Sequence, residues 1–216
     1  MNRKTDRLIT FNRKNILDAA DKLFSENSVE KTTMDILAAE AGCSKPTLYG
    51  YFKNKDEVFF ALVYNFLKEL TQQVKTAIGS GRSFLDRYTA ICESIFQLAR
   101  RHPLYFEGLI GNINVDIESE STPVIYKKIY ALGEQLNNEL EELINTGKEE
   151  GLIARDLPSS ALLEYLWGGI SGIIRMLLQK PGYLRIQNLN ENQFADFCFE
   201  RLLCGCGPQV NQEMKK

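Results

Sequence analysis

Residues 41–55 read AGCSKPTLYGYFKNK. Gly42 is the kind of residue that ends a helix, and Ser44 is the kind that caps the start of the next one. The stretch therefore predicts a tight turn followed by a short helix from Ser44 to about Phe52. Leu48 and Phe52 share one face of that helix, so they form its buried stripe. A short polar-faced helix that follows such a turn and ends in lysines is the kind that enters a major groove of DNA.

Side chains that point away from this stripe suit contacts with DNA. A lysine at the helix start can reach a guanine edge or a phosphate, and tyrosine hydroxyls suit phosphate oxygens. A lysine in the first turn of the next helix can share a phosphate with free backbone N–H groups. The candidate DNA contacts are Thr33, Ser44, Lys45, Pro46, Thr47, Tyr49, Tyr51 and Lys55. The simpler alternative is that these residues only form a solvated surface.

Helix signals flank the stretch on both sides. Apolar residues recur at helical spacing and predict a first helix over residues 11–26. Thr33 offers a cap for a second helix that ends before the turn. Asn54 caps a fourth helix, which continues to about Ile78, and Glu57 stands at the reciprocal capping position. The first 60 residues thus predict three short helices and the start of a long one.

The remaining sequence is also dominated by helix signals and contains no convincing strand. Glycine and proline separate the apolar stripes. The polar and acidic segment 111–121 predicts a loop. The predicted helices of this half cover residues 83–100, 104–110, 122–150, 158–179 and 190–204. Together with the first four they predict an all-α fold of about nine helices.

Composition indicates a globular protein with one basic surface. Of 216 residues, 44% are apolar and 25% are charged, and the net charge of -2 argues against a protein that coats nucleic acid nonspecifically. Residues 1–17 nevertheless hold five Lys/Arg against one Asp, whereas residues 61–216 hold sixteen Lys/Arg against nineteen Asp/Glu. A local basic footprint on a mildly acidic chain suits contact with phosphates through one face.

Residues 13–60 resemble the DNA-binding domain of the TetR family of transcriptional regulators. The residues that fall in that family's order and spacing are Ile16, Ala19, Ala20, Leu23, Phe24, Thr32, Thr33, Met34, Leu37, Ala38, Ala41, Gly42, Ser44, Thr47, Leu48, Tyr49, Tyr51, Phe52, Lys53, Asn54, Lys55 and Glu57. Beyond residue 60 only the architecture is similar, because the C-terminal domains of that family diverge widely.

The resemblance implies a three-helix, helix-turn-helix DNA-binding domain over residues 1–55, with a basic arm at 1–10. A C-terminal helical domain for ligand binding and dimerisation, residues 56–216, would follow. The resemblance further implies a homodimer joined through the last two long helices, which binds double-stranded operator DNA as a repressor. A small-molecule effector of unknown identity would release it by shifting the fourth helix as a lever.

Some residues depart from the family's pattern. Ser28 stands where glycine is usual, and we expect Asn27 to take the positive φ instead. Cys43 replaces a common valine, and Pro46 stands where glycine is frequent. These departures leave the prediction of DNA binding intact, and the sequence does not reveal the operator.

The C-terminal half carries aromatic side chains that suit a cleft for a flat or apolar effector. Arg175 lies in an otherwise apolar helix, where it can pair with Glu164 or anchor an anionic effector. The alternatives are that the aromatic residues form an ordinary core and that the arginine lies at its rim. The candidate ligand contacts are Tyr88, Phe96, Tyr105, Phe106, Tyr126, Tyr130, Trp167 and Arg175.

Small residues interrupt the same apolar helix. Gly168, Gly169 and Gly172 each cost helix stability relative to alanine, so they indicate that another element packs close by or that a pocket needs the space. Because the resemblance places the last two long helices in a dimeric four-helix bundle, we expect close packing across the two-fold axis.

Three competing hypotheses are less well supported. An enzyme would need a catalytic motif, and the single histidine, His102, only precedes a proline at a helix end. A thiol- or metal-responsive regulator would use Cys198, Cys204 and Cys206, which have no histidine near them. A purely structural helical adaptor protein would have no function for the basic surface. We therefore expect no cofactor, no metal site and no membrane contact, and the odd number of cysteines favours reduced thiols in the cytoplasm.

Overall fold

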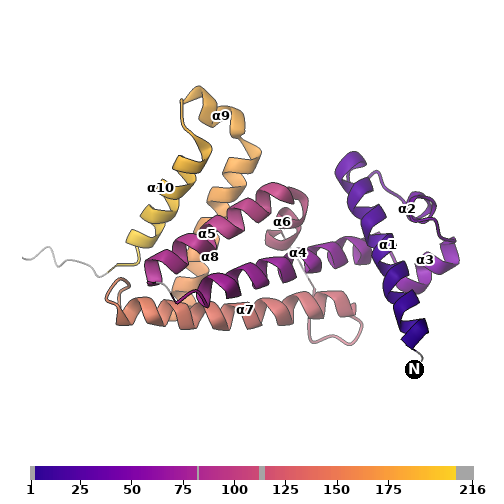
Figure 1. Cartoon of the computed structure of the whole chain (residues 1–216), viewed down its shortest axis with the longest axis horizontal. Coiled ribbons are helices and arrows are strands. Elements are labelled where there is room, and N and C mark those ends of the chain that lie inside the picture. Colours follow the sequence, from indigo (N-terminus) through magenta and orange to yellow (C-terminus); the bar gives the residue numbers. More distant parts are fainter. Residues whose placement is uncertain (1–2, 82, 112–114, 208–216) are drawn as a thin grey trace, which may run out of the picture. The chain divides into compact units, whose positions relative to one another are not determined.

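The computed structural model describes residues 3–81, 83–111 and 115–207, and this part of the chain contains ten helices and no strand (Figure 1). The predicted all-α class is confirmed, with one helix more than expected. The chain divides into two compact units, one of residues 1–67 and 111–130 and the other of residues 68–110 and 131–216. Two long helices, α4 (Lys55–Ile78) and α7 (Val124–Glu149), contribute to both units.

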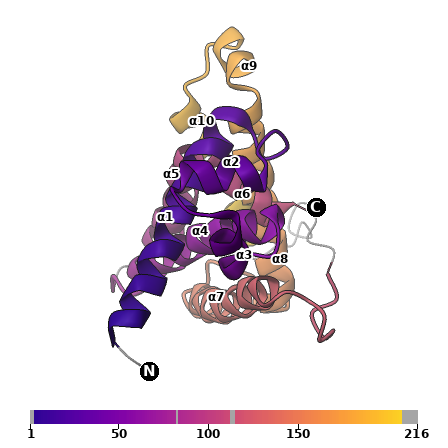
Figure 2. The same ribbon diagram turned by 90° about the vertical axis from the view of Figure 1, so that its right-hand side faces the viewer.

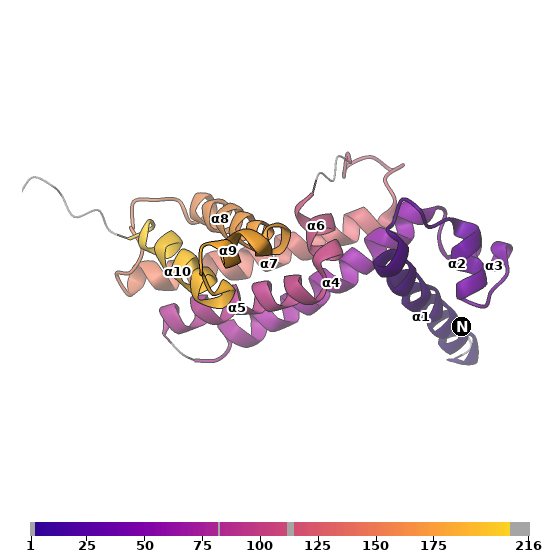
Figure 3. The same ribbon diagram turned by 90° about the horizontal axis from the view of Figure 1, so that it is seen from above.

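The N-terminal unit begins with a three-helix bundle, in which α2 packs against both α1 and α3 (Figure 3). Its buried residues come from apolar positions at helical spacing, with Ile16 and Ala20 on α1, Leu37 on α2 and Leu48 on α3. The bounds of these helices are α1 (Arg3–Asn27), α2 (Met34–Glu40) and α3 (Lys45–Tyr51).

The first helix is longer than the sequence indicated, since it starts at Arg3 and was expected to start near Phe11. The apolar stripe only marks the part of α1 that is buried. Leu8 and Phe11 precede that part and are largely exposed. The helix nevertheless continues toward the N-terminus because residues 3–27 contain neither glycine nor proline.

The backbone reverses after α1 at Ser28, which adopts a positive φ of 69°. The expectation that Asn27 takes this conformation is wrong, because Asn27 is the last helical residue. The Ser28 N–H donates to the carbonyl of Phe24 at 3.2 Å, and the Ser28 carbonyl accepts from the Thr32 hydroxyl at 2.9 Å. These bonds hold a serine where glycine would adopt the same conformation without steric cost.

A series of aromatic rings joins α1, α4 and the start of α7 inside the N-terminal unit. The Phe24 and Phe59 ring centroids are 6.1 Å apart, and those of Phe59 and Phe60 are 5.2 Å apart. Phe60 in turn lies 4.7 Å from Tyr126 on α7. Edge and tilted pairs of this kind stabilise packing beyond the area they bury. Residues 111–130 are thereby part of the unit that holds the helix-turn-helix.

The second unit is built around α8, which packs against α5, α6 and α10. Leu166, Ile170 and Ile174 recur along α8 and are buried, as its apolar stripe predicts. The helices completing this unit, with the end of α4 and most of α7, are α5 (Phe84–Arg101), α6 (Pro103–Ile110), α8 (Ser159–Gln179), α9 (Pro181–Ile186) and α10 (Glu191–Cys204).

The short helix α9 connects α8 to α10 and was not predicted (Figure 2). The sequence Lys180-Pro181-Gly182 does end α8, as expected. Proline, however, suits the first position of a helix as well as the end of the previous one. Leu184 is buried and holds the short turn against the unit.

By length and composition alone, α8 could cross a membrane, and it is the one such helix in the described part of the chain. Apolar helices in the cores of other proteins have the same composition, so this is weak evidence. Its contacts with α5, α6 and α10 account for the apolar face.

Candidate nucleic-acid interface and effector region

The two helices of the predicted DNA-reading motif are capped as the sequence indicates. Thr33 Oγ1 accepts from the backbone N–H of Ile36, and Ser44 Oγ accepts from that of Thr47, each at 3.3 Å. The hydroxyls of Ser44 and Thr47 also share a hydrogen bond of 2.8 Å. Capping therefore fixes where α3 begins, and it engages three of the candidate side chains.

The turn between α2 and α3 depends on a glycine. Gly42 has a φ of 63°, and its N–H donates to the carbonyl of Ala39. The next N–H, of Cys43, donates to the carbonyl of Ala38 at 3.0 Å. This satisfies the last carbonyls of α2 and turns the chain into α3. Leu48, which is fully buried, then fixes the rotation of α3 about its axis.

With Leu48 inward, the opposite face of α3 is exposed. Tyr49 is a large side chain on this exposed face, and the residue is 51% exposed. Lys45 is also exposed, and its ammonium lies 2.7 Å from the Asp35 carboxylate. An exposed pair of this kind contributes only about 0–1 kcal/mol, so the lysine can exchange its partner for a phosphate at little cost.

Two other candidates are held by neighbouring elements. The Tyr51 hydroxyl accepts a hydrogen bond from the Asn12 side chain at 3.3 Å. Lys55 donates from Nζ to the carbonyl of Glu30 at 3.2 Å. Both side chains are half-buried, and both are positioned beside α1 or the loop that follows it. All eight candidates thus belong to the N-terminal unit.

The start of α4 is capped almost as predicted. Asn54 Oδ1 accepts from the backbone N–H of Glu57 at 2.9 Å. The Glu57 carboxylate reaches one residue further back than a reciprocal cap would, and accepts from the N–H of Lys53 at 2.6 Å. The segment joining α3 to α4 is fixed by these two bonds.

Arg13 belongs to the same surface, although the sequence pattern singled it out only as one of several N-terminal basic residues. Its guanidinium lies over the Phe52 ring, 5.1 Å from the centroid. Its position in the sequence could have indicated this, because Arg13 lies one turn before Ile16, on the buried face of α1. That register directs Arg13 toward the end of α3.

Two of the aromatic candidates for effector binding line one cavity. Tyr88 and Trp167 line a small apolar cavity of about 50 Å³ between α5, α7 and α8 in the second unit. Phe96, Tyr105 and Phe106 are buried in the same unit and do not line it. Their contribution to an effector site stays a prediction.

Tyr88 also links two helices. Its hydroxyl donates to the carbonyl of Phe199 on α10 at 2.9 Å. Burial is the main cause that raises the pKa of Tyr88, and the neighbouring Cys92 adds to the rise. The neutral phenol therefore acts as a hydrogen-bond donor that joins α5 to α10 at the edge of the cavity.

The two remaining tyrosine candidates belong to the N-terminal unit. Tyr126 packs on Phe60, and its pKa is raised, mainly by burial and further by the carboxylates of Asp56 and Glu57. Tyr130 is 53% exposed. Neither residue lines the cavity of Tyr88 and Trp167.

Arg175 pairs with Glu107 on α6, with 3.1 Å between Nη2 and Oε2. A carboxylate partner is present, as one of the alternatives suggested, but it is Glu107 and not Glu164. Gln179 donates to the other oxygen of the same carboxylate at 3.1 Å. The arginine is largely exposed and ties α8 to α6 at the surface, as the rim alternative suggested.

Comparison with known proteins shows what this architecture is. The profile of the family described as bacterial regulatory proteins, tetR family, matches residues 16–62. The chain thus carries the DNA-binding domain of the TetR family. It is accordingly a helix-turn-helix transcriptional regulator, and its family and relatives are regulators rather than enzymes.

Two relatives and two solved structures illustrate the similarity. The chain is 29% identical over 135 residues to the uncharacterized HTH-type transcriptional regulator YhgD of Bacillus subtilis, covering 62% of this chain and 70% of that protein. Identity to YvdT of the same organism is 25% over 137 residues, covering 61% and 71%.

The fatty acid degradation regulator FadR of Bacillus halodurans has a similar fold, with a TM-score of 0.67 and 20% identity over 90% of this chain and 95% of that one. A TetR/AcrR-family regulator of Thermobifida fusca gives a TM-score of 0.68 and 20% identity over 89% and 97%. At this identity the two structures support the fold alone.

The cysteines give the thiol- or metal-responsive alternative no support. Burial raises the pKa of the Cys198 and Cys206 thiols, which disfavours the reactive thiolate. Cys204 is exposed. In the described part of the chain, no three His, Cys, Asp or Glu side chains come together as metal ligands.

Proposed function

We propose that the protein is a homodimeric repressor that binds operator DNA through α3 and is released by a small molecule bound in its C-terminal helical domain. The observation that carries this proposal is the capped α3, which buries Leu48 and presents Tyr49 on its exposed face. In this proposal residues 1–55 bind DNA and residues 56–216 bind the effector and dimerise.

Each candidate DNA contact has a role in the proposal. Lys45, Pro46 and Thr47 begin α3, so they face base edges in the major groove. Tyr49, Tyr51 and Lys55 bind phosphate oxygens on either side. Thr33 and Ser44 cap the starts of α2 and α3. The other backbone N–H groups in the first turn of each helix are then directed at phosphates.

Dimerisation through α8 and α10 is supported by an exposed stripe on α8. Tyr165, Gly168 and Gly172 share one face of that helix, and Tyr165 is half exposed. A Cβ at either glycine would meet no atom of the chain within 4 Å. Phe197 adds a second exposed apolar group on α10. A second copy of the chain would cover both helices and use the space left by the glycines.

The effector is proposed to bind where Tyr88 and Trp167 line the apolar cavity. Bacillus subtilis FadR, a structural neighbour, was solved with stearoyl-CoA, and SmeT with triclosan. The cavity of about 50 Å³ is smaller than the ~300–1,000 Å³ usual for such ligands. An effector therefore has to widen it by moving α5, α7 or α8. In this proposal the effector binds the widened state more tightly than the closed state. That difference in binding free energy shifts α4 and so weakens DNA binding.

The first experiment is a gel-shift titration against the protein's own upstream promoter region at two salt concentrations with nonspecific competitor. A discrete complex that survives competitor and weakens with salt would support the proposal. No complex at any salt would count against operator binding at that promoter. Cytoplasmic localisation belongs to the same proposal, because the operator has to be reached.

The second experiment uses the single tryptophan of the chain, Trp167, which lines the cavity. Stearoyl-CoA and triclosan are titrated while Trp167 fluorescence and operator binding are followed together. A saturable fluorescence change that coincides with release of DNA would support an effector at this cavity. Release of DNA with unchanged fluorescence would place the effector elsewhere.

A further inference from the structure

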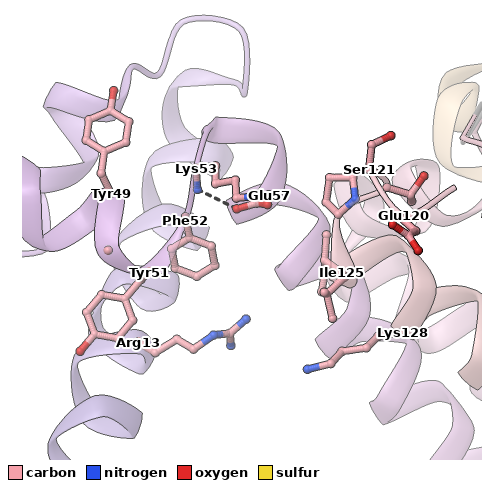
Figure 4. A pocket seen from close by; sticks show the side chains of 14 residues that line it. Arg13, Tyr49, Tyr51, Phe52, Lys53, Glu57, Glu120, Ser121, Ile125 and Lys128 are labelled. Atoms are coloured by element: carbon pink, nitrogen blue, oxygen red, sulfur yellow. Dashed lines mark hydrogen bonds between the residues drawn. The ribbon is translucent and has the colours of Figure 1, made fainter.

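A second hollow lies in the N-terminal unit, whereas the cavity of Tyr88 and Trp167 belongs to the other unit. The second hollow has a volume of about 450 Å³ and is formed by the end of α3, the turn into α4, the segment 120–123 and the first turns of α7 (Figure 4). Residues 111–130 belong to this unit, so both walls are part of one compact body. The volume falls within the range of ~300–1,000 Å³ found for sites of small molecules.

Two cationic side chains face the hollow from opposite walls. Figure 4 shows the guanidinium of Arg13 and the ammonium of Lys128 directed toward one another across the open space. In the described part of the chain, neither side chain is within ion-pair distance of a carboxylate. Two like charges that face one hollow favour an anion between them.

The carboxylates at the hollow do not cancel this preference. Glu57 lines it, but its carboxylate already accepts from the backbone N–H of Lys53 at 2.6 Å. Glu120 lies at the other end of the opening from Arg13 and Lys128 (Figure 4). The site is therefore cationic at one end and carries carboxylates at the other.

An apolar surface adjoins the cationic end. Val124, in the first turn of α7, lines the hollow and is 65% exposed, and Ile125 lies beside it. The Tyr51 phenol completes the wall on the α3 side. A ligand that satisfies this site carries a negative headgroup and an apolar body.

We propose that this hollow is a binding site for a small organic anion, whose carboxylate or phosphate headgroup lies between Arg13 and Lys128 and whose apolar body packs on Val124. A DNA phosphate is the less suitable occupant. Two of the determinants, Val124 and Lys128, lie on α7 outside the helix-turn-helix, and an apolar wall offers nothing to a phosphodiester.

Occupation of the site would affect DNA binding directly. Tyr49 and Tyr51 line the hollow and are also proposed phosphate contacts. An anion held beside them competes with the operator for the same positive surface, so the two ligands weaken each other by the same factor. This route to release does not need the cavity in the second unit.

The test is a calorimetric titration of the full-length protein, without DNA, with octanoate, octyl phosphate and the uncharged octanamide. We expect saturable binding of the two anions and none of the amide. A preference between the two anions identifies the headgroup. Lys128→Gln should weaken anion binding about tenfold or more, as loss of a hydrogen bond to a charged group does. Lys127→Gln, next to it on α7 but not lining the hollow, should leave binding unchanged.

Three outcomes would overturn the proposal. Octanamide could bind as tightly as octanoate, which would make the site merely apolar. Lys128→Gln could bind the anions as the parent does. Lys128→Gln could instead weaken operator binding with no anion present, which would assign the hollow to the DNA interface. Because the titration uses no DNA, its failure leaves the proposed operator binding untouched.

Discussion

The backbone of Gly169 lies directly against the side chain of Leu202. A Cβ placed on residue 169 would stand 2.6 Å from both Cδ atoms of Leu202 and 3.2 Å from its Cγ. Small residues on α8 were expected to serve the dimer, but this glycine serves contact between α8 and α10 within one chain. The neighbouring glycines, 168 and 172, have open space beside them. The contact with Leu202 therefore accounts for Gly169 alone, and a dimer contact at the other two glycines stays a proposal.

Gly169→Ala should destabilise the protein. The methyl group would force the half-buried Leu202 side chain to shift, and overpacking of this kind costs ~1–3 kcal/mol, partly offset by the better helix propensity of alanine. Urea denaturation measures the difference. The matched control is Gly133→Ala on α7, where the added Cβ meets nothing within 4 Å. That variant should gain up to about 1 kcal/mol. Equal effects of both substitutions would contradict the packing argument.

Tyr49→Ala should weaken operator binding roughly tenfold and leave the proposed dimer intact, because it would remove the proposed hydrogen bond to a charged phosphate. Tyr130→Ala is the matched control. The two tyrosines are equally exposed, at 51% and 53%, but Tyr130 is not on α3. Quantitative gel shifts at one fixed salt concentration compare the three proteins. If Tyr49→Ala binds as tightly as the parent, Tyr49 is not a DNA contact.

Ser28→Gly should stabilise the protein by about 0.5–1 kcal/mol, because glycine adopts a positive φ without the steric cost that serine bears. Thermal unfolding would show a higher midpoint. Gly42→Ala provides the opposite case, since residue 42 has a φ of 63° and alanine is strained there. A loss of stability in Ser28→Gly would mean that the serine side chain contributes more than its backbone costs.

Alkaline pH should destabilise the protein through Cys92. Burial is the main cause that raises the pKa of this thiol to about 12. The folded state therefore holds the proton more tightly than the unfolded state. The stabilisation that the protonated Cys92 thiol contributes is complete below the pKa of a thiol in the unfolded chain, about 8.5. It is lost as the pH rises toward 12. Urea denaturation between pH 8 and about 11 follows the loss.

A variant separates Cys92 from other groups that titrate at high pH. Cys92→Ala leaves a small cavity that lowers stability at every pH, so the slope against pH is compared and not the absolute value. The slope should be shallower than in the parent. Cys204→Ala, which removes an exposed thiol, should retain the slope of the parent. Identical slopes in all three proteins would exclude Cys92 as the cause.

The sequence predicted best the features that depend on neighbouring residues. Caps at Ser44 and Asn190 start α3 and α10 as expected, because a capping side chain bonds to N–H groups two or three residues away. The start of α1 was missed, since an amphipathic stripe reports burial and α1 extends beyond its buried part.

Contacts between distant residues could not be predicted in the same way. Glu164, on the same helix, was one suggested partner for Arg175, but the observed partner, Glu107, lies on α6. The bond from Tyr88 to the Phe199 carbonyl spans 111 residues. The hollow of Arg13 and Lys128 likewise depends on the packing of residues 111–130 beside the helix-turn-helix, which no local pattern encodes.

Gly172→Glu should separate the proposed dimer without unfolding the chain. Within one chain the position is open, and a side chain there meets no atom within 4 Å. In a helical bundle across a two-fold axis, the same side chain would bring a charge into the interface and prevent close approach of α8. Sedimentation velocity should show monomers, and operator affinity should fall because two half-sites are no longer bound together. Gly133→Glu on α7 controls for the added charge. A dimer that persists in Gly172→Glu would mean that α8 does not form the interface.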